Sequence, residues 1–183
     1  MSAEPLLNPP PRGAIGRPGW RFLLSHPAHV IALGFGSGLA PVAPGTAGTL
    51  WAWLVFDVLQ AAMSDTARAV VLVVATLGGW WACTVTARHL GQADPSAIVW
   101  DEVVAFWLIL WLVTPAGLWP QAIAFVLFRI FDAAKPGPVG WADRRFKLRH
   151  GETIGWAQGF GILFDDVVAA LCTLMVIALW RFV

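Results

Sequence analysis

The sequence is poor in charged residues, which make up 13% of its 183 residues, whereas hydrophobic residues make up 58%. A soluble domain carries roughly 25% charged residues, so this chain has too little polar surface to cover a soluble globule. A bilayer removes that requirement, and the composition therefore predicts a membrane protein. The formal net charge of +1 indicates no nucleic-acid partner. Tyrosine is absent, but twelve tryptophans are present, a load that suits helix ends at headgroup level.

Cysteine is also scarce. Cys83 and Cys172 both lie inside apolar stretches, so the sequence indicates neither a disulfide framework nor a cysteine metal site. We expect both thiols to be buried as small hydrophobic groups. The four histidines show no spaced pair that would indicate zinc.

The chain divides into an N-terminal arm and one membrane domain. Prolines interrupt residues 1–25, and no apolar core follows a basic start there, so this stretch is not typical of a cleaved signal peptide. We predict a mobile basic arm over 1–25 and a single membrane-embedded domain over 26–183. The run from Ile31 to Leu50 is apolar but rich in glycine and proline, which predicts broken or re-entrant structure rather than a continuous helix.

Five apolar stretches follow, and we predict an all-α polytopic helical bundle in which four or five of them span the bilayer. They cover about 49–63, 67–88, 98–114, 119–132 and 161–181, with a basic loop over 135–159. If the N-terminus is cytoplasmic, ten of the twelve Lys and Arg residues fall on the cytoplasmic side and two on the other. This positive-inside bias fixes the predicted orientation.

That orientation places three groups of acids at the cytoplasmic ends of three helices: Asp101 with Glu102, Asp132, and Asp165 with Asp166. Acids in a first helical turn also complement the helix dipole, which is the simpler interpretation. Converging carboxylates, however, cannot all stay ionised without a cation between them, and Mg²⁺ is the ion that carboxylates and phosphate oxygens share best. We therefore predict that these five acids hold Mg²⁺.

Basic residues flank one of these acids in the pattern Arg129-x-x-Asp132-x-x-Lys135, where residues three apart are neighbours on a helix surface. A local ion pair would explain the spacing equally well. Arg offers a planar fork for a phosphate group and Lys a point charge beside it, so we expect both to bind a phosphoryl group next to the metal. Backbone N–H groups of the Gly45–Gly48 segment, including those of Thr46 and Gly48, are further candidates for the same phosphate.

Four stretches carry a resemblance to a known family. GFGSGLAPVAPGTAGTL (34–50), IVWDEVVAFW (98–107), FRIFDAAKPGPVGWAD (128–143) and GFGILFDDVVAA (159–170) resemble phosphatidylglycerophosphatase A in order and content. Each motif is weak alone, but four in order are specific. The family-like positions are Pro44, Gly45, Thr46, Gly48, Asp101, Glu102, Arg129, Asp132, Lys135, Pro136, Asp143, Asp165 and Asp166. The segment between Asp143 and Asp165 is longer than expected, and His150 and Glu152 in it match no family role.

The resemblance implies a Mg²⁺-dependent enzyme of the bacterial inner membrane that hydrolyses phosphatidylglycerophosphate to phosphatidylglycerol and inorganic phosphate, with its active site on the cytoplasmic face. Arg129, Asp132, Lys135 and Asp166 are then the expected catalytic residues. The alternative is a small membrane transporter for divalent cations or phosphate, which uses intramembrane acids and broken segments too. A transporter's site lies near mid-membrane, whereas these acids are predicted at one face.

Overall fold

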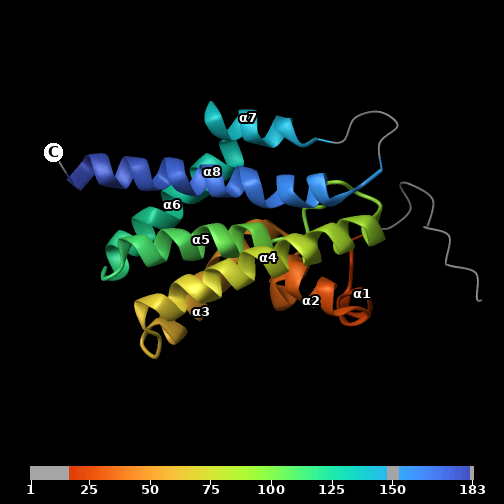
Figure 1. Ribbon diagram of the computed structural model, residues 1–183, viewed down its shortest axis with the longest axis horizontal. Coiled ribbons are helices and arrows are strands. Elements are labelled where there is room, and N and C mark those ends of the chain that lie inside the picture. Colours follow the sequence, from red (N-terminus) through yellow and green to blue (C-terminus); the bar gives the residue numbers. More distant parts are fainter. Residues whose placement is uncertain (1–16, 148–152, 182–183) are drawn as a thin grey trace, which may run out of the picture.

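The computed structural model describes residues 17–147 and 153–181, and within these ranges every regular element is a helix (Figure 1). The elements in order are α1 (Trp20–Leu24), α2 (Pro27–Ala32), the 3-10 helix η1 (Gly34–Leu39), α3 (Pro44–Gln60), α4 (Asp65–Leu90), α5 (Trp100–Val113), α6 (Leu118–Ala134), α7 (Pro138–Arg145) and α8 (Trp156–Arg181). The all-α prediction is confirmed. Residues 1–16 of the predicted arm, together with His150 and Glu152, lie outside the described residues, and the end of the arm forms α1.

Helix α5 is the centre of the bundle. Its sequence is apolar on every side after Glu102, and a helix of that kind is stable only when other elements surround it. Helices α3, α4, α6 and α8 pack around it, and α8 also packs on α4 and α6. The side chains of Val103, Phe106 and Leu110 are therefore completely or almost completely buried. This arrangement fixes the first turn of α5, and the acids it carries, inside the bundle.

The glycine- and proline-rich segment is broken, as predicted, into α2, η1 and a turn before α3. Phe35 and Ala43 have positive φ values of 55° and 47°, and Pro44 then opens α3 at the position where a missing N–H costs nothing. Gly38 lies so close to the loop before α5 that an added Cβ would be 2.1 Å from the carbonyl oxygen of Ala97. The broken segment therefore supports both the start of α3 and the start of α5.

Three of the four histidines gather where α2 packs on α4. His29 Nδ1 lies 2.8 Å from the carbonyl oxygen of Phe22, which only accepts, so this nitrogen carries the proton. Nε2 of neutral His29 then accepts from Nδ1 of His89, 2.8 Å away. Burial is the main cause that lowers the pKa of His29, which favours the neutral form of this ring. Together with His26, whose Nδ1 caps α2, the histidines attach the broken segment to α4.

Helix α7 lies inside the stretch that was predicted to be a loop, and that prediction is wrong for residues 138–145. Pro136 and Pro138 suggested an end of helical structure, but Pro138 is the first residue of a helix, where proline is tolerated. Val139 and Ala142 are buried as α7 packs on α8. Gly140 permits the contact with the end of α6, because a Cβ there would lie 2.5 Å from the carbonyl oxygen of Lys135.

Two of the described helices, α4 and α8, are long and apolar enough to span a bilayer. The outward faces of α3, α4, α6 and α8 expose large apolar side chains, among them Leu54, Val74, Ile123 and Met175. A soluble surface does not carry such a continuous apolar area. The protein is therefore membrane-associated.

Candidate active site

A cleft lies where α3 and α5 begin and α6 ends, against the middle of α8. The structure brings all seven charged residues of the predicted site into its lining: Asp101, Glu102, Arg129, Asp132, Lys135, Asp165 and Asp166. Asp94, in the turn before α5, also lines it. Residues more than 60 positions apart in the sequence therefore share one polar cavity in an apolar bundle.

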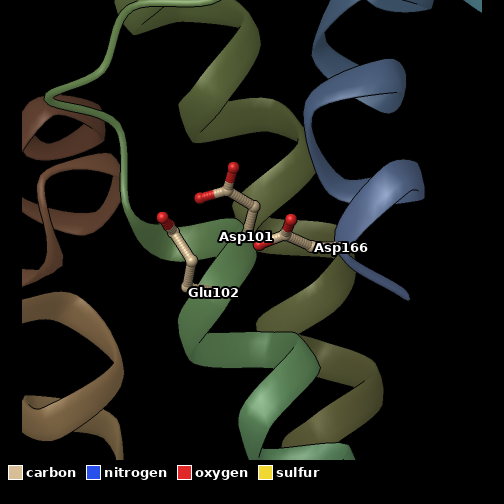
Figure 2. A group of neighbouring side chains, drawn as sticks. All are labelled: Asp101, Glu102 and Asp166. Atoms are coloured by element: carbon tan, nitrogen blue, oxygen red, sulfur yellow. The ribbon is translucent and has the colours of Figure 1, made fainter. Parts of the chain in front are cut away.

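Asp101, Glu102 and Asp166 form what we call the carboxylate trio (Figure 2). The first turn of α5 supplies two of them and α8 the third, and one oxygen from each lies within 4.8 Å of the others. Asp101 Oδ1, Glu102 Oε2 and Asp166 Oδ2 are buried and have no hydrogen-bond partner among the described residues. Buried carboxylate oxygens without partners are costly. Among the described residues one cation lies near the three acids, Arg129 at 3.7 Å from Glu102, so the group fits an added cation.

Arg129 lies on one side of the trio. Its Nη1 is 2.6 Å from Oδ2 of Asp132, one turn along α6, and 3.7 Å from Oε1 of Glu102. The same nitrogen lies 3.5 Å from Oγ1 of Thr49 on α3. The guanidinium is thus fixed between α6, α5 and α3, as the three-residue spacing suggested, and it lines the cleft.

Lys135 lies on the other side, between two carboxylates. It closes α6 in the left-handed conformation, with φ of 45°, and its Nζ donates to Asp143 Oδ1 at 2.7 Å and to Asp165. Burial alone would lower the pKa of Lys135, but the hydrogen bonds that it donates to Asp143 and Asp165 raise the pKa above its ordinary value. Burial likewise opposes ionisation of Asp143, whereas hydrogen bonds from Lys135 and Lys147 lower its pKa. Lys135 is therefore a fixed cation.

The beginning of α3 closes the cleft. Gly45 lines it so tightly that an added Cβ would be 2.1 Å from Oε1 of Glu102. The first N–H groups of a helix have no intrahelical partner, so those of α3 are available to an anion in the cleft. Thr46 is absent from the lining, and Gly48 instead faces Val99, whose Cβ would be 2.7 Å from an added Cβ. Of the three predicted residues of this segment, the structure places Gly45 at the site.

Two acids at this site were not selected from the sequence. Asp94 lies in the turn GQADPS, where acids are common, and only its position before α5 links it to the site. Asp143 was noted as a family-like position without a role, and it contacts Lys135 eight residues earlier. Because the chain turns between α6 and α7, no helical spacing relates Asp143 to Lys135. The contact depends on α7, which the sequence did not predict.

The arrangement combines a place for a metal cation and a place for a phosphate group in one cleft. A hard divalent cation with oxygen ligands suits the trio, and two fixed cations beside it suit the oxygens of a phosphate group. Such a pairing stabilises negative charge that moves between a phosphorus centre and its leaving group.

Comparison with known proteins also indicates a phosphatase. A family model described as phosphatidylglycerophosphatase A matches residues 30–181. A protein of Escherichia coli with the name phosphatidylglycerophosphatase A is 38% identical over 152 residues, which cover 82% of this chain and 81% of that protein. A Haemophilus influenzae protein of the same name is 34% identical over 155 residues, or 84% of this chain and 88% of that protein. No solved structure matches the chain.

Proposed function

Because the chain belongs to the phosphatidylglycerophosphatase A family, and is therefore a phosphatase of phosphatidylglycerophosphate, we propose that the cleft described above is its active site. The reaction removes the terminal phosphate as inorganic phosphate and leaves phosphatidylglycerol. One observation carries the assignment to this cleft. Three carboxylates, each with a buried oxygen that has no hydrogen-bond partner among the described residues, lie beside two fixed cations in a bundle whose outward faces expose large apolar side chains.

Asp101, Glu102 and Asp166 are proposed to hold Mg²⁺. Their partnerless oxygens support this choice, and carboxylate oxygens are the ligands that Mg²⁺ prefers. When bound, the ion supplies positive charge that stabilises the transferred phosphoryl group. Asp132 and Asp165, also predicted as metal ligands, each give an oxygen to a cation, and they support the proposed site by orienting Arg129 and Lys135.

Arg129 and Lys135 are proposed to bind the terminal phosphate. Arg129 presents a planar fork whose position is set by Asp132, and Lys135 presents a point charge whose position is set by Asp143 and Asp165. The N–H group of Gly45, in the first turn of α3, adds an uncharged donor at the cleft. These groups stabilise charge that develops on the phosphate oxygens as the ester bond breaks.

Helices α3, α4, α5, α6 and α8 are proposed to cross the inner membrane of a bacterial cell, with the cleft on the cytoplasmic side. The ten-to-two distribution of basic residues supports this orientation. Single cysteines at Lys147, beside the cleft, and at Ala62, in the α3–α4 turn, should react with an impermeant thiol reagent from opposite sides of the membrane. Labelling of Lys147→Cys from outside intact cells would overturn the orientation.

The catalytic proposal is tested by release of inorganic phosphate from phosphatidylglycerophosphate by purified protein in detergent, with and without Mg²⁺. A protein of Bacteroides thetaiotaomicron, described as a candidate phosphatidylinositol-3-phosphatase, is 37% identical over 160 residues, so phosphatidylinositol 3-phosphate is the matched comparison substrate. We expect release that requires Mg²⁺ and is faster from phosphatidylglycerophosphate. Full activity in excess chelator, or unchanged rates in both Asp101→Asn and Asp166→Asn, would place the active site elsewhere.

A further inference from the structure

The five helices of the bundle differ in length in a systematic way. Helices α3, α5 and α6 have 17, 14 and 17 residues, whereas α4 and α8 have 26 each. At 1.5 Å per residue the short helices are about 21–26 Å long and the long ones about 39 Å. All five reach the same end of the bundle, at the left of Figure 1, where the α3–α4 turn, the α5–α6 turn and the end of α8 lie. The cleft lies at the opposite ends of the three short helices.

The short helices do not reach across a bilayer. The hydrocarbon core is about 30 Å thick, and any tilt shortens a helix along the membrane normal. If the common end of the bundle lies at one boundary of this core, the cleft lies roughly 4–9 Å inside the other boundary. Helices α4 and α8 continue past the cleft and leave the core. The level between the cleft and the membrane surface must therefore be occupied by other parts of the chain.

Two segments on opposite sides of the bundle in Figure 1 surround the cleft end of the short helices, and together we call them the collar: residues 20–42, which include α1, α2 and η1, and residues 138–145, which form α7 and run beside α8. Its apolar side chains point outward: Leu24 is 74% exposed, Val42 81% and Trp141 56%. Basic side chains accompany them, because Arg21, Arg144 and Arg145 are exposed too. Exposed tryptophan and leucine next to arginine is the composition of a segment at the boundary of headgroups and acyl chains.

We propose that the collar lies in the near leaflet, against anionic headgroups and the first acyl carbons, and that the cleft opens below the headgroup plane. The proposal rests on the five-crossing topology proposed above. It assigns the broken segment and α7 a lipid partner along their exposed faces. A phospholipid then brings its headgroup phosphate to Arg129 and Lys135 while its acyl chains stay in the leaflet.

The depth of the collar is measurable with spin labels. Single cysteines replace Leu24, Val42 and Trp141 in protein that carries Cys172→Ala, since the remaining Cys83 is fully buried. Relative accessibility to oxygen and to a water-soluble nickel chelate, in vesicles that contain anionic lipid, reports the depth of each label. Val74→Cys on the outward face of α4 is the deep control, and Gln92→Cys in the turn after α4 is the aqueous control.

We expect the three collar labels at shallow depth, about 5–10 Å below the headgroup level, between the two controls. Collar labels as accessible to nickel as Gln92, with Val74 still in lipid, would overturn the collar and leave the five crossings intact. An aqueous label at Val74 would contradict the crossing of α4 itself, and the collar with it.

A functional measurement tests the same inference through a different readout. Leu24→Asp puts a charge on the exposed face of α1, and Gln92→Asp puts the same charge outside the collar. With substrate embedded in vesicles, we expect Leu24→Asp to lower kcat/KM about fivefold or more, while Gln92→Asp has no such effect. With a short-chain, water-soluble form of the substrate, both variants of the reconstituted protein should match the parent. Equal loss on both substrates in Leu24→Asp would show damage to the fold instead and would count against the collar.

Discussion

The cleft contains two groups of acids that differ in their partners. On one side, the carboxylate trio keeps three buried oxygens without any hydrogen-bond partner among the described residues. On the other, Asp143 and Asp165 share Lys135, and Asp132 is paired with Arg129. Both groups are carboxylates around the same cleft. Each acid of the second group forms a direct ion pair with Arg129 or Lys135, whereas among the described residues the trio has one cation near it, Arg129 at 3.7 Å from Glu102. This difference separates the proposed place for an added cation from cations that the chain already provides.

This comparison predicts opposite stability effects when a charge is removed. Without metal, the carboxylates of the trio repel each other, so neutralising one of them relieves repulsion. Neutralising a partner of Lys135 instead leaves a half-buried ammonium with fewer hydrogen bonds. The same chemical change, Asp to Asn, therefore distinguishes the two groups before any activity is measured.

The largest effect is expected in the trio. Asp166→Asn should lower the catalytic rate by about 10³-fold, since a bound ion stabilises several kcal/mol of transition-state charge. In metal-free buffer its Tm should equal or exceed that of the parent protein, and Mg²⁺ should raise the Tm of the parent but not of the variant. Thermal unfolding in detergent with and without Mg²⁺ measures both. A metal-free Tm that is lower in Asp166→Asn than in the parent protein would contradict the distinction between the trio and the ion-paired acids.

The next effect concerns Arg129 and Lys135, the cations proposed to bind the phosphate. Lys135→Ala and Arg129→Ala should each lower the catalytic rate by ~10²-fold or more, on the scale of a lost electrostatic donor. The Mg²⁺-dependent rise in Tm should persist, because neither residue belongs to the trio. Steady-state kinetics on mixed micelles, combined with the same unfolding measurement, tests this. Loss of the Mg²⁺ response in Lys135→Ala would mean that the two groups are not separate.

Asp143 should have a smaller effect, since it acts through Lys135. Asp143→Asn is expected to lower the rate about tenfold, the scale of a residue that orients a catalytic group, and to destabilise the fold by about 1–3 kcal/mol through the weakened hydrogen bonds. Asp143→Glu, which restores the charge, should recover part of the rate. The matched control is Lys147→Met, which removes the exposed partner of Asp143 and should change the rate little. Equal losses of catalytic rate in Asp143→Asn and Lys147→Met would mean that both substitutions act through the folding of α7.

The smallest effect is expected outside the cleft. Arg144 and Arg145 are exposed at the end of α7 and have no place in the cleft lining. Their joint replacement by Ala should leave kcat unchanged and weaken attraction to anionic vesicles by about 1 kcal/mol per charge at low salt. Rates measured at low and high ionic strength test this. A large fall in kcat for this double variant, with kcat unchanged in Lys135→Ala, would mean that Arg144 and Arg145 bind the substrate phosphate and Lys135 does not.

The sequence predicted the main helices and the gathering of acids because both follow from local patterns. Long apolar stretches give the helices, and the adjacent pairs Asp101–Glu102 and Asp165–Asp166 interrupt two of them. Helix spacing also gave the contact between Arg129 and Asp132. These features need no knowledge of how distant segments pack.

The features that sequence reasoning missed depend on packing between distant segments. Gly159 and Gly161 suggested that α8 starts late, but the helix begins at Trp156. Both glycines lie inside the helix at close contacts with distant segments, Gly159 with Thr84 and Gly161 with Phe146. The pairing of Lys135 with Asp143 depends on α7, which places Asp143 beside the end of α6. No periodicity in the sequence predicts these contacts.

In the proposed five-crossing topology, the unequal helix lengths make the thickness of the host membrane a variable of the reaction. A bilayer with longer acyl chains raises the headgroups further above the cleft, and one with shorter chains brings them level with it, because the short helices cannot lengthen in response. Hydrophobic mismatch therefore acts at the entrance of the active site rather than on the fold as a whole. The same polypeptide should therefore process vesicle-embedded substrate at rates that depend on the acyl-chain length of the surrounding bilayer.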